Sequence, residues 1–160
     1  MTRTVSLISA LLFSTSVFAH EVAVGDLQVI HAHIPAPAAS AKSAAGYMAI
    51  ANDGPEAERL IGVEVDFAHA MLHTTIFSAD GIASMTHIEA VEIPAGDAVV
   101  LEPGGIHVML MGLTRSLAVG DMLPATLIFE HAGPVAIEFM VDPADGSMDH
   151  SMMDHSTTGN

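Results

Sequence analysis

Short segments in which apolar and polar residues alternate recur through the middle of the chain, with turn-forming residues between them. Alternation of period two is the pattern of a strand that buries one face. The pattern predicts strands at residues 27–34, 46–51, 60–65, 70–77, 83–91, 98–101, 107–113, 125–130 and 135–141. No segment carries a helical stripe of useful length. We therefore expect an all-β protein, an antiparallel Greek-key sandwich of cupredoxin-like or immunoglobulin-like architecture.

Residues 1–19 have the pattern of a secretory signal peptide. Arg3 precedes an apolar stretch over residues 5–18 that is too short to span a bilayer, and Val17-Phe18-Ala19 offers a small residue for cleavage. We expect cleavage after Ala19 and a periplasmic location. No later stretch approaches ~20 continuous apolar residues, so no membrane-spanning segment is expected.

Residues 20–142 are expected to form one domain, followed by a tail of different composition at residues 143–160. The domain is long enough to bury a sizeable core. The formal net charge of −15 disfavours nucleic acid and anionic lipid as partners. The chain has no cysteine, which excludes disulfides and thiolate metal ligands. Stability must therefore come from the core.

Two His and two Met residues on separate predicted strands are the most informative donors in the chain. They are His73, Met85, His107 and Met109. Thioether sulfur and neutral imidazole are poor ligands for magnesium or calcium and good ligands for Cu(I). A thioether also needs no deprotonation and stays soft in an oxidising compartment. These donors predict a Cu(I) site outside the cytoplasm.

The predicted strands can bring these donors together. Residues i and i+2 of a strand share a face, so His107 and Met109 point to the same side. A hairpin that closes near Asp80-Gly81 places His73 close to Met85 across the ladder. Convergence of all four residues at one end of the sandwich is geometrically reasonable.

The spacing of these donors resembles the signature of the PCu(A)C family of periplasmic Cu(I)-binding proteins, also called copper chaperone A. That signature is a His, about ten residues, a Met, twenty-one residues and then His-x-Met. Met85 and His107 are separated by twenty-one residues, and His107-Val108-Met109 supplies the last element. Flanking segments are also similar to the family's, among them Gly46-Tyr47-Met48, Ile93-Pro94-Ala95-Gly96, Leu101-Glu102-Pro103-Gly104-Gly105 and Met109-Leu110-Met111-Gly112-Leu113. The resemblance covers roughly residues 22 to 141.

One spacing departs from the family pattern, because eleven residues rather than about ten separate His73 from Met85. An extra residue in the turn around residues 78–80, or a β-bulge, would absorb the difference. A register slip of one residue would instead turn His73 to the opposite face, and His69 or His87 could then take its place.

The resemblance implies a His2Met2 site for Cu(I) and a metallochaperone rather than an enzyme. Proteins of this family carry copper through the periplasm and, in several members, help to load the dinuclear copper centre of cytochrome oxidase together with a thiol-bearing partner. Blue-copper electron transfer needs a thiolate, which this chain lacks. Copper storage or detoxification is an alternative role, and so is a β-sandwich interaction module that binds no metal.

The tail at residues 143–160 is a second candidate for copper binding. It has too little apolar pattern to fold, so we expect it to be disordered. Thioethers suit Cu(I), whereas imidazole and carboxylate suit Cu(II). The tail offers both kinds of donor, at Met148, His150, Met152, Met153 and His155. We expect an auxiliary site that raises the local copper concentration near the domain.

The expected mature N-terminus is a third candidate. Cleavage after Ala19 would place an α-amine and an imidazole on His20, and this pair chelates Cu(II). His31 and His33 alternate on one face of the first predicted strand and could complete such a site.

Overall fold

The computed structural model describes residues 21–145, and this part of the chain consists of strands joined by turns and loops. The strands within it are β1 (Glu21–Val24), β2 (Leu27–Pro35), β3 (Ser43–Asn52), β4 (Glu58–Val65), β5 (His69–Phe77), β6 (Ala83–His87), β7 (Val91–Ile93), β8 (Asp97–Leu101), β9 (Ile106–Met111), β10 (Met122–Phe129) and β11 (Gly133–Asp142). The prediction of an all-β protein is confirmed. Among the described residues, no helix is long and apolar enough to cross a membrane.

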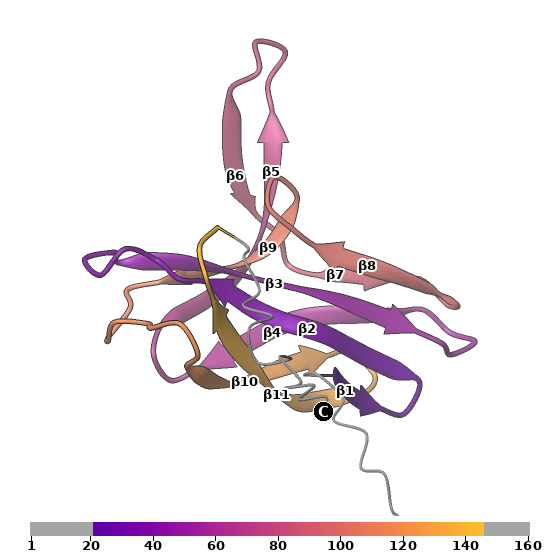
Figure 1. The fold of residues 1–160 in the computed structure, drawn as a ribbon. Helices are drawn as coiled ribbons and strands as arrows, with labels where there is room; N and C mark the ends of the chain where they lie inside the picture. The colour runs from indigo at the N-terminus through magenta and orange to yellow at the C-terminus, as the bar shows by residue number, and fades with distance from the viewer. Residues whose placement is uncertain (1–20, 146–160) are drawn as a thin grey trace, which may run out of the picture.

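Strand β3 connects two parts of one curved, mixed sheet (Figure 1). Its first residues, 43–46, pair with β9, and the sheet continues from β9 through β5 to β6. The rest of β3 pairs with β2 on one side and β8 on the other. From β2 the sheet runs through β11, β10 and β4 to β7. The β5–β6 hairpin projects from the body of the molecule, with β9 at its base (Figure 1).

The core is built by the alternating residues that the sequence pattern indicates. Along β11, for example, Val135, Ile137, Phe139 and Val141 are buried, while Ala136 and the other intervening residues are more exposed. Phe67, Phe129 and Phe139 are the largest buried side chains. Burying a side chain of this kind contributes about 2 kcal/mol relative to leaving it exposed. Packing of this core stabilises a chain that has no disulfides.

The predicted strand at residues 83–91 is divided in the structure. β6 ends at His87, and β7 begins at Val91. β6 pairs with β5 at one end of the sheet, whereas β7 pairs with β4 at the other. The apolar alternation continues through the break because Ile88 packs against the core while the chain crosses between the two parts.

Two further features differ from the sequence-based expectation. β2 and β11 pair in parallel, through Met140 opposite His33 and Val141 opposite Ile34, so the sheet is mixed rather than wholly antiparallel. β1 precedes the first predicted strand and pairs with β2 as an additional short strand. Both differences bring other elements against β2, which therefore lies beside β1, β3 and β11.

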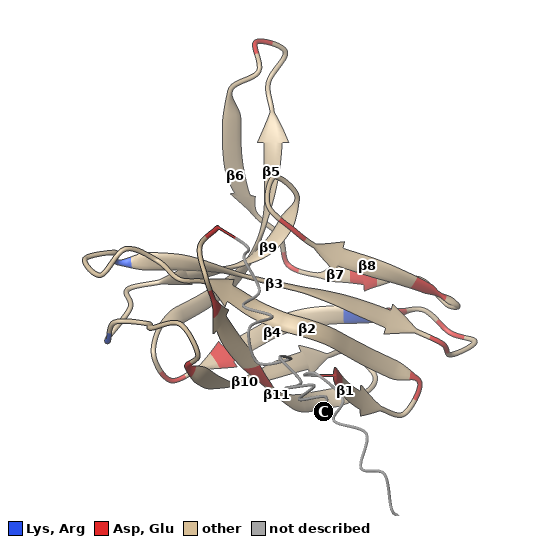
Figure 2. Cartoon of the chain, viewed as in Figure 1, with Lys and Arg blue, Asp and Glu red and all other residues tan. Residues whose placement is uncertain are grey.

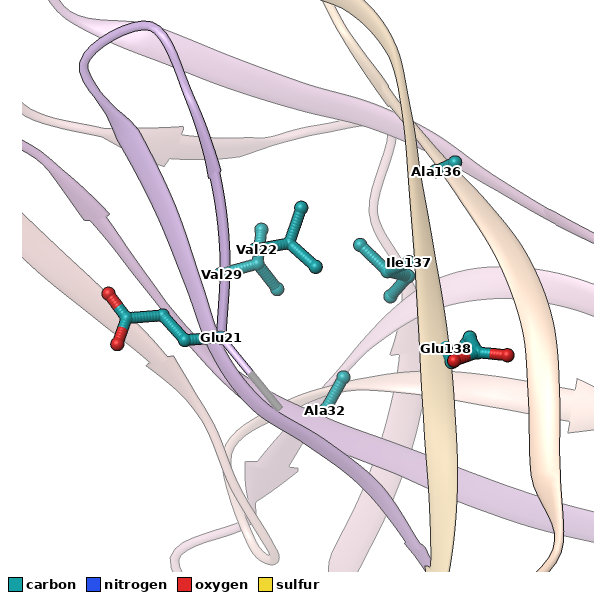
Figure 3. Close-up of a pocket in the computed structure, with 7 residues that line it drawn as sticks. All are labelled: Glu21, Val22, Val29, Ala32, Ala136, Ile137 and Glu138. Atoms are coloured by element: carbon teal, nitrogen blue, oxygen red, sulfur yellow. The ribbon is translucent and has the colours of Figure 1, made fainter. Parts of the chain in front are cut away.

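A hollow of about 370 Å³ lies between β1, β2 and β11 (Figure 3). The side chains of Val22, Val29, Ala32 and Ile137 line it together with Glu21 and Glu138, whose carboxylates point away from the space (Figure 3). The lining offers no soft donor and includes no residue of β5, β6 or β9. The hollow is therefore separate from the predicted metal ligands.

Acidic residues are spread over the body of the molecule, whereas the β5–β6 hairpin is almost uncharged (Figure 2). Its only charged residue is Asp80, in the turn. Apolar side chains near the end of the hairpin are exposed, among them Ile76, Phe77 and Ile82. The hairpin thus offers an apolar surface on an acidic protein.

Candidate metal centre

Three histidines lie side by side across the strands β6, β5 and β9. His73 of β5 is directly opposite His87 of β6 on one side and His107 of β9 on the other. The ring centroids are 5.9 Å apart for His73 and His87 and 6.0 Å apart for His73 and His107. Directly opposed residues point to the same side of a sheet. One face of the hairpin and its base therefore carries a row of imidazoles.

Methionines extend this row on the same face. Met109 follows His107 by two residues in β9, and its partner in β5 is Met71. Met85 precedes His87 by two residues in β6 and is opposite Thr75. Residues two apart share a face, so Met85 and Met109 lie on the side that carries His73 and His107. The structure thus brings the four predicted ligands to one face.

The longer spacing between His73 and Met85 does not move His73 to the other face. Its partner is His87, and Thr75 is the partner of Met85, so the register keeps His73 and Met85 on one side. The additional length lies in the turn, where the Ser78 N–H donates to the Ile82 carbonyl at 2.9 Å and Gly81 has a φ of +77°. His87 and His69 are the two histidines that could replace His73 if the register were altered. His87 lies directly opposite His73, and His69 lies four residues before His73 in β5, opposite Met111.

Two ring nitrogens in the row are buried without a hydrogen-bond partner. His107 is only 3% exposed, and its Nδ1–H donates to the Gly105 carbonyl at 3.2 Å, which leaves the buried Nε2 unpaired. Nδ1 of His73 is also buried and unpaired. An unsatisfied buried polar atom costs about 1–3 kcal/mol, so such atoms usually have a role. A carbonyl can only accept, so the tautomer of His107 presents the Nε2 lone pair, as a metal ligand requires.

The electrostatic surroundings favour neutral imidazole at His73. Burial lowers the pKa of the His73 side chain below its ordinary value of 6.5, and the neighbouring His107 and His87 lower it further, because their charged forms would repel a second charge. A neutral ring keeps its lone pair available at a lower pH than an ordinary histidine does. The geometry and the charge state therefore both suit a cation.

Exposure differs sharply along the set of donors. His107 is buried at the base of the hairpin, whereas Met85, on the edge strand β6, is 61% exposed. His87 is exposed as well, and its Nδ1–H donates to the Leu72 carbonyl at 3.1 Å. One end of the donor set is thus fixed and enclosed, and the other is open to solvent.

Two donors on this face are not among the four predicted ligands: His87, which the sequence offers only as an alternative to His73, and Met71. The spacing pattern selects Met85 and passes over His87, although period-two alternation places both on one face. Met71 is half-buried, lies opposite Met109 and is not among the predicted ligands. Its position two residues before His73 was the signal that could have identified it. The candidate secondary ligands His20, Met148, His150, Met152, Met153 and His155 lie outside the described residues.

Solved structures of known proteins are similar to this chain in fold and in sequence. A PCuAC domain from PmoF1 solved without metal superposes with a TM-score of 0.66 at 34% identity, over 78% of this chain and 99% of that one. A copper-bound PCuAC domain from PmoF2 has the same TM-score and coverage at 32% identity. A Cu(I) form of DR1885 from Deinococcus radiodurans has a TM-score of 0.59 at 28% identity, over 78% of this chain and 81% of that one. The chain is thus a PCuAC-type domain.

The sequence comparison gives the family. The family model described as lipoprotein LpqE-like matches residues 27–141, and the chain belongs to this family, which is the PCuAC-type family. The lipoprotein Lxx21020 of Leifsonia xyli is 33% identical over 104 residues. That match spans 62% of this chain and 62% of the length of the relative.

Proposed function

We propose that this protein is a copper carrier that binds Cu(I) through His73, Met85, His107 and Met109. The observation that carries the proposal is the pair of buried, unpaired ring nitrogens, His73 Nδ1 and His107 Nε2, on the face that also carries the thioethers. The copper-bound PmoF2 domain and the Cu(I) form of DR1885 support copper as the cargo. The assignment of the individual ligands rests on the register of β5, β6 and β9.

The donor chemistry selects the oxidation state. Two imidazoles and two thioethers are neutral, so they match the low charge and softness of Cu(I), whereas Cu(II) prefers nitrogen and oxygen in a tetragonal arrangement. The chain has no cysteine for a blue-copper centre. Because thioethers stabilise Cu(I) strongly, easy redox cycling is disfavoured. Carriage of the ion suits this site better than oxidase or dismutase chemistry.

The gradient of exposure provides a route for transfer. Met85 lies on the exposed edge strand, so an incoming ligand can displace its thioether before it reaches His107. His73 and Met109 would follow, one ligand at a time, while His107 remains bound last. An acceptor with thiolates would complete such an exchange, because thiolate is a softer and stronger ligand for Cu(I) than thioether.

The apolar end of the hairpin is the surface we propose for contact with the acceptor. Phe77 is 60% exposed and Ile82 is 68% exposed, and both lie near Met85 in the β5–β6 hairpin. A contiguous exposed apolar surface on a protein is a common mark of an interaction site. Copper could thus leave from the element that makes the contact.

Within this role, we propose that the protein acts in the periplasm, after cleavage of residues 1–19, and supplies copper for assembly of a cytochrome oxidase centre through a thiol-bearing partner. Storage or detoxification is the alternative purpose of the same site. Mass spectrometry of the exported protein tests the cleavage after Ala19. An auxiliary role of residues 143–160 is tested by their deletion, which should lower copper stoichiometry.

A transfer assay tests the function. The Cu(I)-loaded protein is mixed with an apo dithiol protein, and copper is followed by separation of the two and metal analysis. A chaperone should pass its copper to the dithiol faster than the metal dissociates into a competing chelator. Transfer no faster than that dissociation would instead favour storage, and absence of Cu(I) uptake would contradict the whole proposal.

A further inference from the structure

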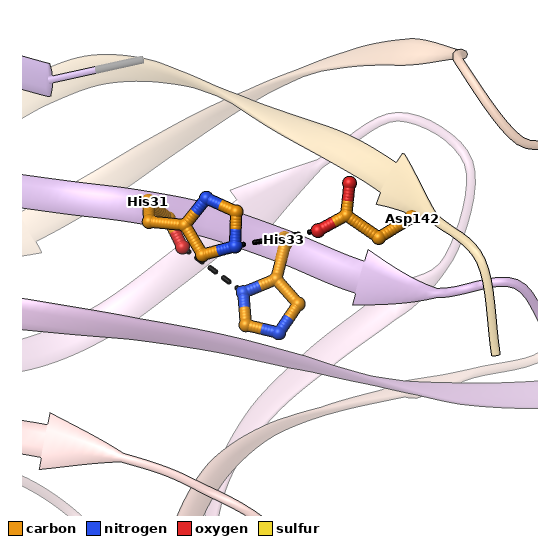
Figure 4. A group of neighbouring side chains, drawn as sticks. All are labelled: His31, His33 and Asp142. Atoms are coloured by element: carbon orange, nitrogen blue, oxygen red, sulfur yellow. Dashed lines mark hydrogen bonds and ion pairs between the residues drawn. The ribbon is translucent and has the colours of Figure 1, made fainter. Parts of the chain in front are cut away.

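A second group of metal-binding side chains lies on β2 and β11, away from the hairpin. It consists of His31, His33 and Asp142, and the three residues can each offer one ligand atom within 4.8 Å of the others. Nε2 of His31 is 3.3 Å from Oδ2 of Asp142 (Figure 4). The imidazoles of His31 and His33 stack with their centroids 4.4 Å apart. Two imidazoles and a carboxylate thus converge at one place.

The backbone holds this arrangement in a specific way. The pairing of β2 with β3 shifts by one residue between Ile30 and His33, and His31 within this irregularity has a φ of +49°. It is the only residue other than glycine with a positive φ in the described part of the chain. A positive φ is unfavourable for a side chain with a Cβ, so such positions often have a functional reason.

The parallel pairing of β2 and β11 supplies the carboxylate. Met140 is opposite His33 and Asp142 is opposite Pro35, so His33 and Asp142 lie on the same side of the sheet. The carboxylate of Asp142 is 14% exposed and His31 is 37% exposed. The group is therefore fixed by the sheet and still open to an ion from solvent.

One hydrogen bond fixes the tautomer of His33. Nδ1–H of His33 donates to the His31 carbonyl at 3.0 Å. A carbonyl can only accept, so this bond assigns the proton to Nδ1 and leaves the lone pair on Nε2 of His33. Ligating histidines typically have one ring nitrogen bound in this way, which fixes the ring and its tautomer.

We propose that His31, His33 and Asp142 form a second metal site, which binds Cu(II) most tightly and Zn(II) more weakly. Imidazole and carboxylate suit both ions, and Cu(II) leads the order of affinities for nitrogen and oxygen donors. Bonds of about 2.0–2.2 Å place ligand atoms within about 4.4 Å of one another, so small side-chain rotations would close the site. The absence of a thioether from this group distinguishes it from the Cu(I) site.

This proposal goes beyond the proposed function and does not depend on it. Its residues belong to β2 and β11, whereas the Cu(I) ligands belong to β5, β6 and β9. A Zn(II) titration therefore tests the second site without testing the Cu(I) site, and one proposal can be contradicted while the other stands.

The test uses the mature full chain labelled with ¹⁵N, titrated with Zn²⁺ and followed by NMR residue by residue. We expect the imidazole nitrogens of His31 and His33, and the amide of Asp142, to shift together. His33→Ala should weaken the binding reported by His31 at least about tenfold, since it removes a ligand and not only a supporting contact. The control His69→Ala removes an exposed histidine of β5 and should leave this binding unchanged.

Two further variants separate metal binding from folding. His31→Gly suits a positive φ, so the spectrum of the fold should persist while the Zn²⁺-induced shift of His33 is lost. Asp142→Asn should also weaken binding, because it removes the negative charge. The proposal would be overturned if Zn²⁺ did not shift the NMR signals of His31 and His33, or if His31→Gly left the Zn²⁺ affinity unchanged.

Discussion

His73 and His107 face each other in direct register across β5 and β9, and each has one buried ring nitrogen without a hydrogen-bond partner. Apart from these two, no buried side-chain nitrogen or oxygen among the described residues is unpaired. Desolvation without a partner is unfavourable, and a bound cation would remove that cost at both nitrogens. This relationship connects the fold of the chain to its proposed cargo.

The lowered pKa of His73 predicts a pH-dependent stability for the metal-free protein. Above the ordinary value of 6.5 both states are neutral at this residue and the effect is absent. As the pH falls below 6.5, the unfolded chain takes up the proton first, so the free energy of unfolding decreases until the pH passes the folded-state pKa. Denaturant unfolding at several pH values between 7.5 and about 5 should show this decrease.

Substitution of His73 tests whether this residue causes the pH dependence of stability. His73→Gln should show a smaller decrease over the same pH range, whereas His69→Gln retains His73 and should keep it. An identical pH dependence in the wild type and His73→Gln would contradict this role of His73. In the copper-loaded protein, protonation of His73 should compete with Cu(I) only below pH 6.5, so the loss of affinity that His73 causes should begin below that pH.

Removal of one thioether should weaken copper binding without loss of the fold. Met109→Ile retains an apolar side chain of similar volume, so the free energy of unfolding should change by less than about 1.5 kcal/mol. Cu(I) affinity, measured by competition with a chelator, should fall at least about tenfold. The matched control is Met111→Ile, two residues along the same strand and 43% exposed, which should bind Cu(I) like the wild type. Equal losses in the two variants would contradict the choice of Met109.

The exposed end of the hairpin should affect transfer and not affinity. Ile82→Ser removes an apolar side chain that is 68% exposed, at a position outside the predicted ligands. We expect slower copper transfer to a dithiol acceptor protein and an unchanged Cu(I) affinity. Ile61→Ser on β4 removes a side chain that is 43% exposed elsewhere and serves as the control. A transfer rate that is the same in all three proteins would exclude this contact surface.

Glu58 should be important for stability, because it joins β4 to the turn after β10. Its carboxylate is buried and accepts hydrogen bonds from the backbone N–H groups of Arg59, His131 and Ala132 and from the His131 ring. Burial alone would raise its pKa, but these hydrogen bonds outweigh that effect and lower it below 4.5. The stability they contribute is present above pH 4.5 and is lost as the pH falls through the folded-state pKa.

Denaturant unfolding of Glu58→Gln measures this contribution. We expect a loss of about 3 kcal/mol at neutral pH, because an amide accepts these hydrogen bonds less well and presents its own donors to them. Glu130→Gln is the control, since Glu130 forms an exposed ion pair with Arg59 that should contribute less than about 1 kcal/mol. Equal effects of the two substitutions would contradict the role of Glu58.

Much of the fold could be predicted from the sequence, because the strands that bury one face alternate apolar and polar residues. The break at residues 88–90 could not, since Ile88 continues that alternation while the chain crosses to the other end of the sheet. The parallel pairing of β2 with β11 also depends on which distant strands meet, and no local pattern encodes it.

The candidate site shows a similar division. Spacing alone selects Met85, His107 and Met109 as predicted ligands, whereas the face on which His73 lies depends on one turn that the structure describes. Period-two alternation puts His87 on the face of Met85 and Met71 on the face of His73, but their places opposite His73 and Met109 follow from the register. Asp142 is more than one hundred residues from His31 in the sequence, so their proximity follows from the sheet order.

The most direct test of the Cu(I) site is X-ray absorption spectroscopy of the protein loaded with one equivalent of Cu(I), compared with Met109→Ile. The account predicts a first shell of both nitrogen and sulfur in the wild type, with less sulfur in the variant. A shell without sulfur, or a sulfur contribution that Met109→Ile leaves unchanged, would contradict it.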